Sequence, residues 1–192
     1  IIYEKKYNNF SSEYFSNKEK NIQFYNKLFF DSDVYLGKIL QHYQNLNLDE
    51  DTLLVVISDH GISTGEKFGE RGYGVFCYDY TLLSGAMFCH KNIKPIQIKN
   101  QVRSIDILPT ILELLSINQD PAYEKIQGKS LVPLMNGKIE SRIAFSQSGN
   151  PLSSSKPPKE PNVSAVRTDE LKFILNHYDN TEELYNLKTD PE

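Results

Sequence analysis

The chain has few cysteines, no long apolar run and no excess of positive charge. Each of these absences excludes a class of protein or partner. Its 192 residues include two cysteines, Cys77 and Cys89, which are too few for a disulfide framework and which we expect to be free thiols. No apolar stretch approaches the roughly 18 residues that a membrane-spanning helix needs. The formal net charge of -4 offers no basic surface to a nucleic-acid backbone, so we expect no nucleic acid among the partners.

Several short motifs with known chemistry are also absent. The sequence contains no Gly-x-Ser-x-Gly, no Gly-x-x-x-x-Gly-Lys-Ser/Thr and no His-Glu-x-x-His. Its first residues lack the charged-then-apolar layout of a secretory signal. The chain begins with Ile1 rather than Met, however, and we expect a preceding segment to be missing. The compartment and the oligomeric state therefore stay open.

What is present is ordinary for a globular protein, with 39% hydrophobic and 24% charged residues. The most informative stretch is Thr52-Leu-Leu-Val-Val-Ile-Ser-Asp-His-Gly61. Its apolar run, Leu53 to Ile57, is short, rich in β-branched residues and free of polar alternation, which predicts a strand buried on both faces within a parallel sheet. Polar residues follow at once, and the carboxyl ends of strands in open α/β sheets are where ligands bind.

The pattern around this strand predicts helices and further strands. Apolar residues recur at steps of three and four between residues 21 and 43, which indicates an amphipathic helix lying against the sheet. A second helix is predicted over residues 103–117, with Ser104 or Asp106 at its start and Pro109 in its first turn. Short strands are predicted at residues 85–90 and 144–146.

The carboxyl-terminal part of the chain has a different composition. Residues 148–161 hold four prolines among serines and lysines, which predicts a surface linker or loop. Beyond it, residues 163–167 and 171–176 form a hairpin pattern, and residues 181–187 add a third candidate strand. We therefore divide the chain into an α/β part at 1–147, the linker at 148–161 and a small antiparallel β subdomain at 162–192.

Asp59 and His60 are the candidate metal ligands. A carboxylate oxygen and a neutral imidazole nitrogen together suit a divalent cation that acts as a Lewis acid or activates an oxygen nucleophile. The alternative is a turn held by structural hydrogen bonds, because two donors do not complete a metal site. In the glycine-rich and charged stretch that follows, Lys67 and Arg71 are candidate contacts to an oxyanion, or else solvated loop charges.

Five segments in the same order resemble the later part of sulfatases, in the alkaline phosphatase superfamily. The stretch ending in Asp59-His60-Gly61 is similar to their late metal-binding segment. The other segments are Tyr78-Asp-Tyr-Thr-Leu, Ser104-Ile-Asp-Ile-Leu-Pro-Thr, Gly128-Lys-Ser-Leu-Val-Pro-Leu and Glu183-Leu-Tyr-Asn-Leu-Lys-Thr-Asp-Pro.

This resemblance implies part of an alkaline-phosphatase-like α/β sheet flanked by helices. It implies a divalent metal, usually Ca²⁺, for which Asp59 and His60 are the later pair of ligands, while two acidic ligands come from an earlier segment. It also implies a formylglycine nucleophile within a Cys/Ser-x-Pro-x-Arg motif, which this sequence lacks. Gly69-Glu-Arg71-Gly departs from the family's Gly-Glu-His-Gly, and the lysine that contacts sulfate in many relatives is absent.

The resemblance thus implies the carboxyl-terminal portion of a hydrolase of small-molecule or saccharide sulfate esters, inactive by itself. A hydrolase of phosphoric or phosphonic esters, or a phosphoryl-headgroup transferase of the same superfamily, is the first alternative. A non-catalytic binding module is the second.

Overall fold

The computed structural model describes residues 12–67, 70, 72, 74–122, 125–149 and 159–190. In chain order the helices in these residues are α2 (Ser12–Ser16), α3 (Lys18–Asn45), η2 (Leu48–Glu50), α4 (Asp79–Leu82), η3 (Ser104–Asp106), α5 (Ile107–Leu114) and α6 (Val132–Met135). Four of these helices, η2, α4, η3 and α6, are single turns of three or four residues. The strands are β1 (Leu54–Ile57), β2 (Ala86–Cys89), β3 (Ala144–Ser148), β4 (Val163–Arg167), β5 (Leu171–Asn176) and β6 (Thr181–Asn186).

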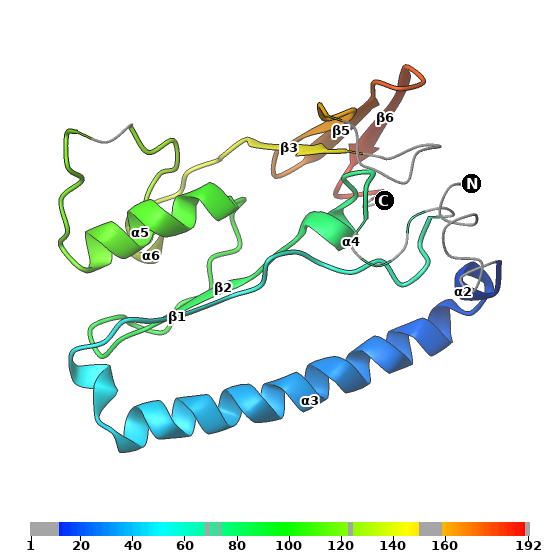
Figure 1. Ribbon diagram of the computed structural model, residues 1–192. Coiled ribbons are helices and arrows are strands. Elements are labelled where there is room, and N and C mark those ends of the chain that lie inside the picture. The colour runs from blue at the N-terminus through cyan, green and yellow to red at the C-terminus, as the bar shows by residue number, and fades with distance from the viewer. Residues whose placement is uncertain are drawn as a thin grey trace.

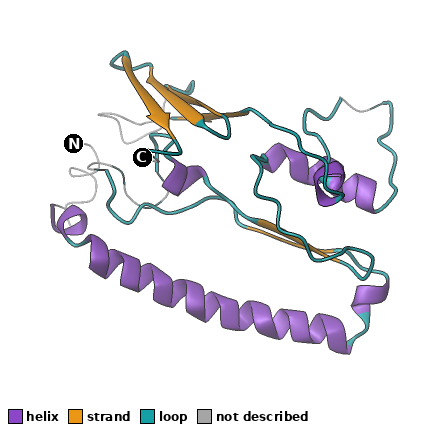
Figure 2. Cartoon of the chain, turned by 180° about the vertical axis from the view of Figure 1, so that it is seen from behind, coloured by secondary structure: helices purple, strands orange, loops and turns teal. Residues whose placement is uncertain are grey.

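These elements form a mixed α/β arrangement with two separate sheets. β1 and β2 make a two-stranded ribbon, and β3 to β6 make a four-stranded antiparallel sheet in sequence order. The long helix α3 runs along one side of the ribbon, and α5 and α6 lie on the other side (Figure 1). The view from behind in Figure 2 shows α4 between the ribbon and the four-stranded sheet. None of the described helices is both long enough and apolar enough to cross a membrane.

The helix predicted over residues 21–43 is confirmed as α3, which is fastened to the rest of the chain near its two ends. Close to its start, the Asn21 side chain donates a hydrogen bond to the Thr64 carbonyl oxygen, with an N–O distance of 2.8 Å. Close to its end, the Tyr43 hydroxyl donates to the Thr52 carbonyl oxygen at 2.6 Å. These bonds hold the start of the helix to the loop that follows β1 and its end to the residues that lead into β1.

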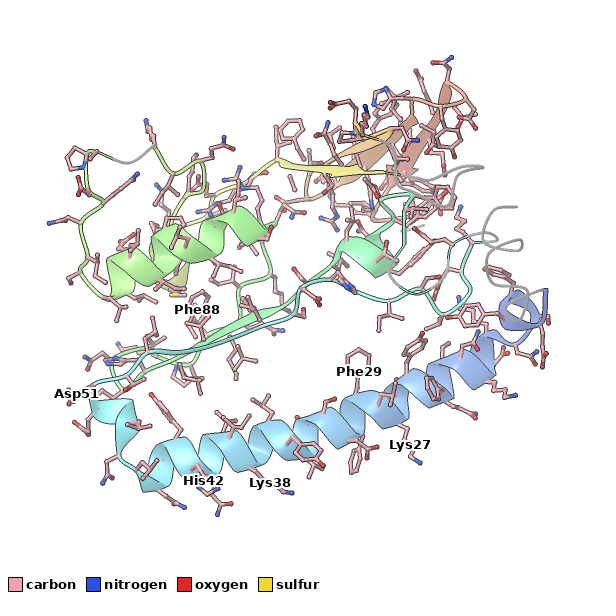
Figure 3. The ribbon with its side chains drawn as sticks, viewed as in Figure 1. Lys27, Phe29, Lys38, His42, Asp51 and Phe88 are labelled. Carbon is pink, nitrogen blue, oxygen red and sulfur yellow. The ribbon has the colours of Figure 1, made fainter. Side chains whose placement is uncertain are left out.

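Between those ends, the apolar side of α3 is not covered. Phe29 points from α3 toward β1, whereas Lys27, Lys38 and His42 point away (Figure 3). Phe29 is nevertheless 61% exposed. Other large side chains of this helix are exposed as well, among them Phe24, Leu28, Phe30, Tyr35 and Ile39. The helix has the predicted orientation, but the prediction that it packs against the sheet is wrong for its middle turns.

The strand predicted at Leu53 to Ile57 is confirmed as β1, but its predicted surroundings are wrong. β1 pairs antiparallel with β2, with Leu54 opposite Cys89 and Ile57 opposite Ala86. Among the described residues no second strand pairs with β1, so its side chains are only half-buried and Ile57 is 56% exposed. An apolar run shows that a strand prefers to be buried, but it does not identify the neighbours that cover it.

The helix predicted over residues 103–117 is confirmed as η3 followed by α5, and its start is organised by the buried carboxylate of Asp106. This carboxylate accepts hydrogen bonds from the Arg103 backbone and guanidinium at 2.8 to 3.2 Å and from the Lys129 backbone N–H at 2.9 Å. The Arg142 guanidinium lies 2.9 Å from the same carboxylate. One side chain thus joins η3, the loop before α6 and the segment that leads into β3.

A second bridge in the same region involves Thr110. Its hydroxyl donates to the Asp106 carbonyl oxygen at 2.6 Å and accepts from the Leu131 N–H at 2.8 Å. Gly128 lies close to η3, and a Cβ there would stand 1.8 Å from the Ile105 carbonyl oxygen. The Asp-x-x-Pro-Thr and Gly-x-Ser-Leu segments are therefore the two sides of one packed junction.

The carboxyl-terminal strands agree closely with the predicted ranges. β4 and β5 coincide with residues 163–167 and 171–176, and β6 ends one residue before the predicted strand. The strand predicted at residues 144–146 extends to Ser148 and pairs with β4, so that this sheet has four strands rather than three. The division at residues 147 and 161 stays a prediction, since residues 150–158 of the linker lie outside the described part.

Buried side chains of β4, β5 and β6 pack against the residues that precede α4. Val163 and Ile174 are fully buried, and Tyr185, Cys77 and Tyr78 join them in one cluster. Both cysteines are free thiols, as predicted. Burial raises the pKa of Cys77 to about 11, so this thiol stays protonated and unreactive at neutral pH.

Replacement of Asp106 should destabilise the fold. Burial alone would raise the pKa of this carboxyl, but the hydrogen bonds from Arg103, Lys129 and Arg142 outweigh burial and hold the pKa below its usual value. Asp106→Asn leaves the buried Arg142 without this ion pair, and we expect a loss of about 3 kcal/mol in the free energy of unfolding at pH 7, measured by urea denaturation.

The loss should depend on pH. A carboxyl whose pKa is lower when folded stabilises the protein above its unfolded pKa, about 4, and this contribution is lost as the pH falls through the folded value. The difference between wild type and Asp106→Asn should therefore shrink below about pH 4. An equal difference at pH 3 and pH 7 would contradict the ion-pair explanation.

Gly128→Ala should also destabilise the junction, because the new methyl group would overlap the Ile105 carbonyl. We expect a loss of about 1–3 kcal/mol in the free energy of unfolding. The matched control is Gly37→Ala on the exposed side of α3, where a Cβ meets nothing within 4 Å. That substitution should stabilise the helix by about 0.5–1 kcal/mol. The same effect from both substitutions, measured by urea denaturation, would contradict the close packing at Gly128.

Candidate metal-binding site

The end of β1 opens into a cavity of about 250 Å³ that also reaches the four-stranded sheet. Its walls come from the β1 end, α4, the segment around η3 and strands β3 to β5. The charged or titratable side chains in its lining are Asp59, His60, Asp79, Arg103, Arg167 and Lys172. The predicted ligands Asp59 and His60 therefore lie together in a charged cavity rather than in apolar packing.

A larger cavity of about 780 Å³ adjoins it, between β2, the loop that follows β2 and α6, and the two cavities share Gly85, Ala86 and Leu131 in their linings. Its lining includes Met87, Phe88, Ile96 and Met135, and it includes no aspartate or glutamate. Size alone would favour this cavity, but carboxylates, which a hard divalent cation prefers, line only the smaller of these two cavities.

The ring of His60 is held in one tautomer. Its Nδ1 lies 2.7 Å from the Gly61 carbonyl oxygen. Because a carbonyl oxygen only accepts, Nδ1 carries the proton and Nε2 keeps its lone pair when the ring is neutral. Histidines that bind metals commonly donate their other ring N–H to a carbonyl or carboxylate in this way. The arrangement therefore presents Nε2 as a possible metal ligand.

The Asp59 carboxylate lies beside this nitrogen. Its Oδ2 is 3.4 Å from His60 Nε2, and its Oδ1 accepts a hydrogen bond from the His60 backbone N–H at 2.9 Å. The Asp59 side chain is 86% exposed, so its oxygens are accessible. Two ligand atoms at right angles around a cation, each about 2.3 Å away, are about 3.3 Å apart. The spacing of the two donors fits a divalent cation.

The described residues supply only part of a coordination shell. Within them, no group of three or more His, Cys, Asp or Glu side chains is placed to hold a metal ion. Asp59 and His60 thus fit as half of a site, and a stable complex needs further donors.

The turn that carries the two ligands is bound closely to α4. The Gly61 N–H donates to the Thr81 carbonyl oxygen at 2.9 Å. Gly61 has no side chain to interfere, and a Cβ there would lie 2.3 Å from the Tyr80 carbonyl oxygen. On the other side of the ligands, Ser58 and Gly85 exchange two hydrogen bonds of 3.0 and 2.8 Å.

Three residues of this cavity, Asp79, Arg167 and Lys172, were given no role by the sequence, although Asp79 lies in one of the segments that resemble sulfatases. Asp79, at the start of α4, accepts hydrogen bonds from the Arg167 Nε at 2.8 and 3.1 Å and from the Lys172 Nζ at 2.7 Å. Asp79 is 8% exposed and Lys172 is fully buried. Arg167 also donates to the Gln101 side chain. The sequence held one indirect signal of this cluster. Arg167 and Lys172 lie in strands with a buried pattern, and a lysine or arginine at a buried position requires a partner of opposite charge.

Lys67 is not among the residues that line this cavity. Its Nζ donates to the Tyr185 hydroxyl at 3.2 Å and lies 5.0 Å from the ring centre of Tyr78 and 5.5 Å from that of Tyr185. Both tyrosine hydroxyls donate to Glu183. Lys67 thus fastens the glycine-rich loop to β6, and its contact with an oxyanion stays a prediction.

Arg71, the other candidate for that role, lies outside the described residues, and its role also stays a prediction. Its neighbour Glu70 is fully buried, and the N–H groups of Val75 and Phe76 donate to its Oε1 at 2.7 and 2.9 Å. Burial raises the pKa of the Glu70 carboxyl despite these bonds. The buried Glu70 carboxylate therefore fixes the backbone at Val75 and Phe76.

Comparisons with known proteins show which family and fold this chain resembles. The model of the family described as Sulfatase matches residues 2–117, a range that contains Asp59 and His60. A protein named Sulfatase from Formosa agariphila is 29% identical over 162 residues, which are 83% of this chain and 29% of that protein.

Two solved structures have a similar fold. One, a protein in complex with its substrate D-glucosamine-2-N,6-O-disulfate, is 22% identical with a TM-score of 0.60 and covers 83% of this chain and 32% of its own. The other is a phosphonate monoester hydrolase from Silicibacter pomeroyi, 21% identical with a TM-score of 0.64 over 82% and 33% of the two chains. At these identities the likeness shows the fold alone. The chain spans about a fifth to a third of the length of the proteins it matches.

The position of Lys67 gives a prediction about stability. Lys67→Met removes a hydrogen bond and a cation–π contact with two partly buried tyrosines, and we expect a loss of about 1 kcal/mol or more in the free energy of unfolding. Lys38→Met is the matched control, because Lys38 lies 5.0 Å from the ring centre of Tyr35 on the exposed α3. Thermal melts should show a smaller change for the control. Equal changes would contradict an anchoring role of Lys67.

Proposed function

Because the chain belongs to the sulfatase family, we propose that it is the carboxyl-terminal, metal-binding part of a hydrolase of sulfate esters. The observation that carries this proposal is the pair of adjacent donors, Asp59 Oδ2 and His60 Nε2, 3.4 Å apart at the end of a strand. The fixed His60 tautomer and the charged cavity around the pair support it.

In this proposal Asp59 and His60 hold a divalent cation, with Ca²⁺ as the ion that the family resemblance implies. The bound cation would supply Lewis-acid stabilisation of charge on the oxygens of the ester. Asp59 contributes the negative charge that attracts a hard cation, and the Gly61 carbonyl keeps the His60 ring oriented. Arg71 or Lys67 would stabilise developing negative charge on the ester group.

The remaining groups would come from polypeptide that precedes this chain in a longer protein. The chain contains no Cys/Ser-x-Pro-x-Arg segment, so the formylglycine nucleophile and the two earlier acidic ligands are assigned to that part. The exposed apolar residues of α3 and β1, such as Phe29 and Ile57, support this assignment, because large apolar surfaces of this kind usually pack against other protein.

For the substrate we propose a small-molecule or saccharide sulfate ester. The similar fold of the protein bound to a disulfated glucosamine favours a saccharide. Arg103 and Arg167 in the cavity lining are compatible with an anionic substrate, although both already pair with aspartates. The second candidate, hydrolysis of a phosphoric or phosphonic ester, is favoured by the similar fold of the phosphonate monoester hydrolase.

A non-catalytic binding module is the third candidate, and the incomplete ligand set of the described residues favours it.

Measurements of turnover separate these three candidates. The isolated chain of residues 1–192 should not hydrolyse 4-nitrophenyl sulfate, because it has no nucleophile and half of a metal site. The longer protein should hydrolyse it faster than the corresponding phosphonate ester. The reverse preference would favour the second candidate, and no turnover of either would favour the third.

Metal binding tests the proposed ligands directly. The isolated chain should bind Ca²⁺ weakly, with a dissociation constant of about 10⁻³ M or weaker, because two protein donors leave most of the hydration shell in place. Asp59→Asn should abolish the binding heat in isothermal titration calorimetry. Asp33→Asn removes the same charge from an exposed position of α3 and should leave the heat unchanged. Equal binding by wild type and Asp59→Asn would contradict the assignment.

A further inference from the structure

The turn that carries Asp59 and His60 is connected to the four-stranded sheet by a short series of contacts. The first is the ion cluster at Asp79, whose Oδ1 lies 2.7 Å from Lys172 Nζ and whose Oδ2 lies 2.8 Å from Arg167 Nε. Arg167 belongs to β4 and Lys172 to β5, and the two residues are paired across the β4–β5 ladder. The sheet therefore presents two cations side by side to a single carboxylate.

The second contact is α4 itself. Asp79 is its first residue, and the Leu83 N–H donates to the Asp79 carbonyl oxygen at 2.8 Å. The helix has a single turn of four residues, so a displacement of Asp79 moves all of it. The Thr81 hydroxyl adds a bond of 3.0 Å to the Tyr78 carbonyl oxygen.

The third contact joins α4 to the ligand turn. The Thr81 carbonyl oxygen accepts from the Gly61 N–H at 2.9 Å, and the backbone of Tyr80 approaches Gly61 so closely that no side chain fits there. The Gly61 carbonyl in turn accepts from His60 Nδ1. The series therefore runs from Lys172 and Arg167 through Asp79 and α4 to the imidazole of His60.

We infer that Asp79 is a positioning residue, which Arg167 and Lys172 hold in place so that the four-stranded sheet sets the orientation of the Asp59–His60 ligand pair. The effect of Asp79 on metal binding rests on the proposed function. The connection from Asp79 through α4 to Gly61 does not. Asp79 donates no atom to the cation in this account. It acts through α4 and the Gly61 N–H.

The arrangement of charge explains why this connection is rigid. Asp79 is 8% exposed, Lys172 is fully buried, and the Arg167 side chain is 22% exposed. Ion pairs screened from water in this way are stronger than exposed pairs, and removing one member of a buried set carries a large cost. A carboxylate held by two cations from neighbouring strands also has little freedom to move.

The test is the hydrogen-exchange rate of the Gly61 amide, followed by NMR in the intact chain without metal. Asp79→Asn keeps the size of the side chain and removes its charge, and the Gly61 amide should then exchange about tenfold faster or more. The Ile174 amide, in the middle of β5, should change much less. Glu170→Gln is the matched control, because Glu170, just before β5, and Lys188, just after β6, form an exposed ion pair beside the same sheet, and it should leave Gly61 exchange within about twofold of wild type.

Arg167→Gln is the second variant, for the case in which Asp79→Asn does not fold, because it leaves the Lys172–Asp79 pair intact. It should raise Gly61 exchange by a smaller factor, and Arg167→Lys should restore part of the protection. Unchanged Gly61 exchange in the folded variants would overturn the inference. An equal rise at Gly61 and Ile174 would also overturn it, because it would mean a general loss of stability.

Calorimetric Ca²⁺ titration of the same variants separates this inference from the proposed function. Weaker Ca²⁺ binding that accompanies faster Gly61 exchange supports both. If exchange rises and the wild type binds no Ca²⁺, the connection through Asp79 stands and the metal assignment fails. If Ca²⁺ binding depends on Asp59 but Gly61 exchange does not depend on Asp79, the metal assignment stands and the positioning role fails.

Discussion

The sharing of one buried carboxylate between two cationic side chains is the interaction on which the structure most depends. It occurs twice. Asp79 is shared by Arg167 and Lys172, and Asp106 is shared by Arg103 and Arg142. Each carboxylate joins segments that are distant in sequence, in a chain whose apolar core is small and whose longest helix is mostly exposed. Because a buried charge without its partner is costly, these clusters specify how the segments meet.

The two clusters have different consequences. Asp106 organises the junction of η3, the Gly128 loop and the segment before β3, and it does not itself line the cavity of the ligand pair. Asp79 lies in the same cavity as Asp59 and His60, so its cluster is both a fold contact and part of the site. The candidate metal ligands are therefore at the exposed end of a network whose other end is buried in the four-stranded sheet.

Local sequence patterns predicted the elements well but not their surroundings. The ranges of β4 and β5 followed from alternation and bounding turns, and α3 followed from a clear helical period, because these features depend on neighbours in the chain. The environment of β1 did not follow, because the burial of Val55 or Ile57 depends on strands that pack beside them. The Asp79 cluster was missed for the same reason, since its partners are 88 and 93 residues away. Lys67 was predicted to contact an oxyanion or to be a solvated loop charge, and its tyrosine partners could not be identified from spacing.

Paramagnetic broadening by Mn²⁺ tests whether Asp59 and His60 together bind a divalent cation, because this method detects even weak binding. Substoichiometric Mn²⁺ added to ¹⁵N-labelled protein shortens the relaxation times of nuclei near the ion. If Asp59 and His60 bind the cation, the amide signals of Asp59, His60 and Gly61 should broaden first, and excess Ca²⁺ should restore them. Broadening that begins at another acidic surface, such as Glu182 on β6, and leaves these three signals sharp would contradict this assignment.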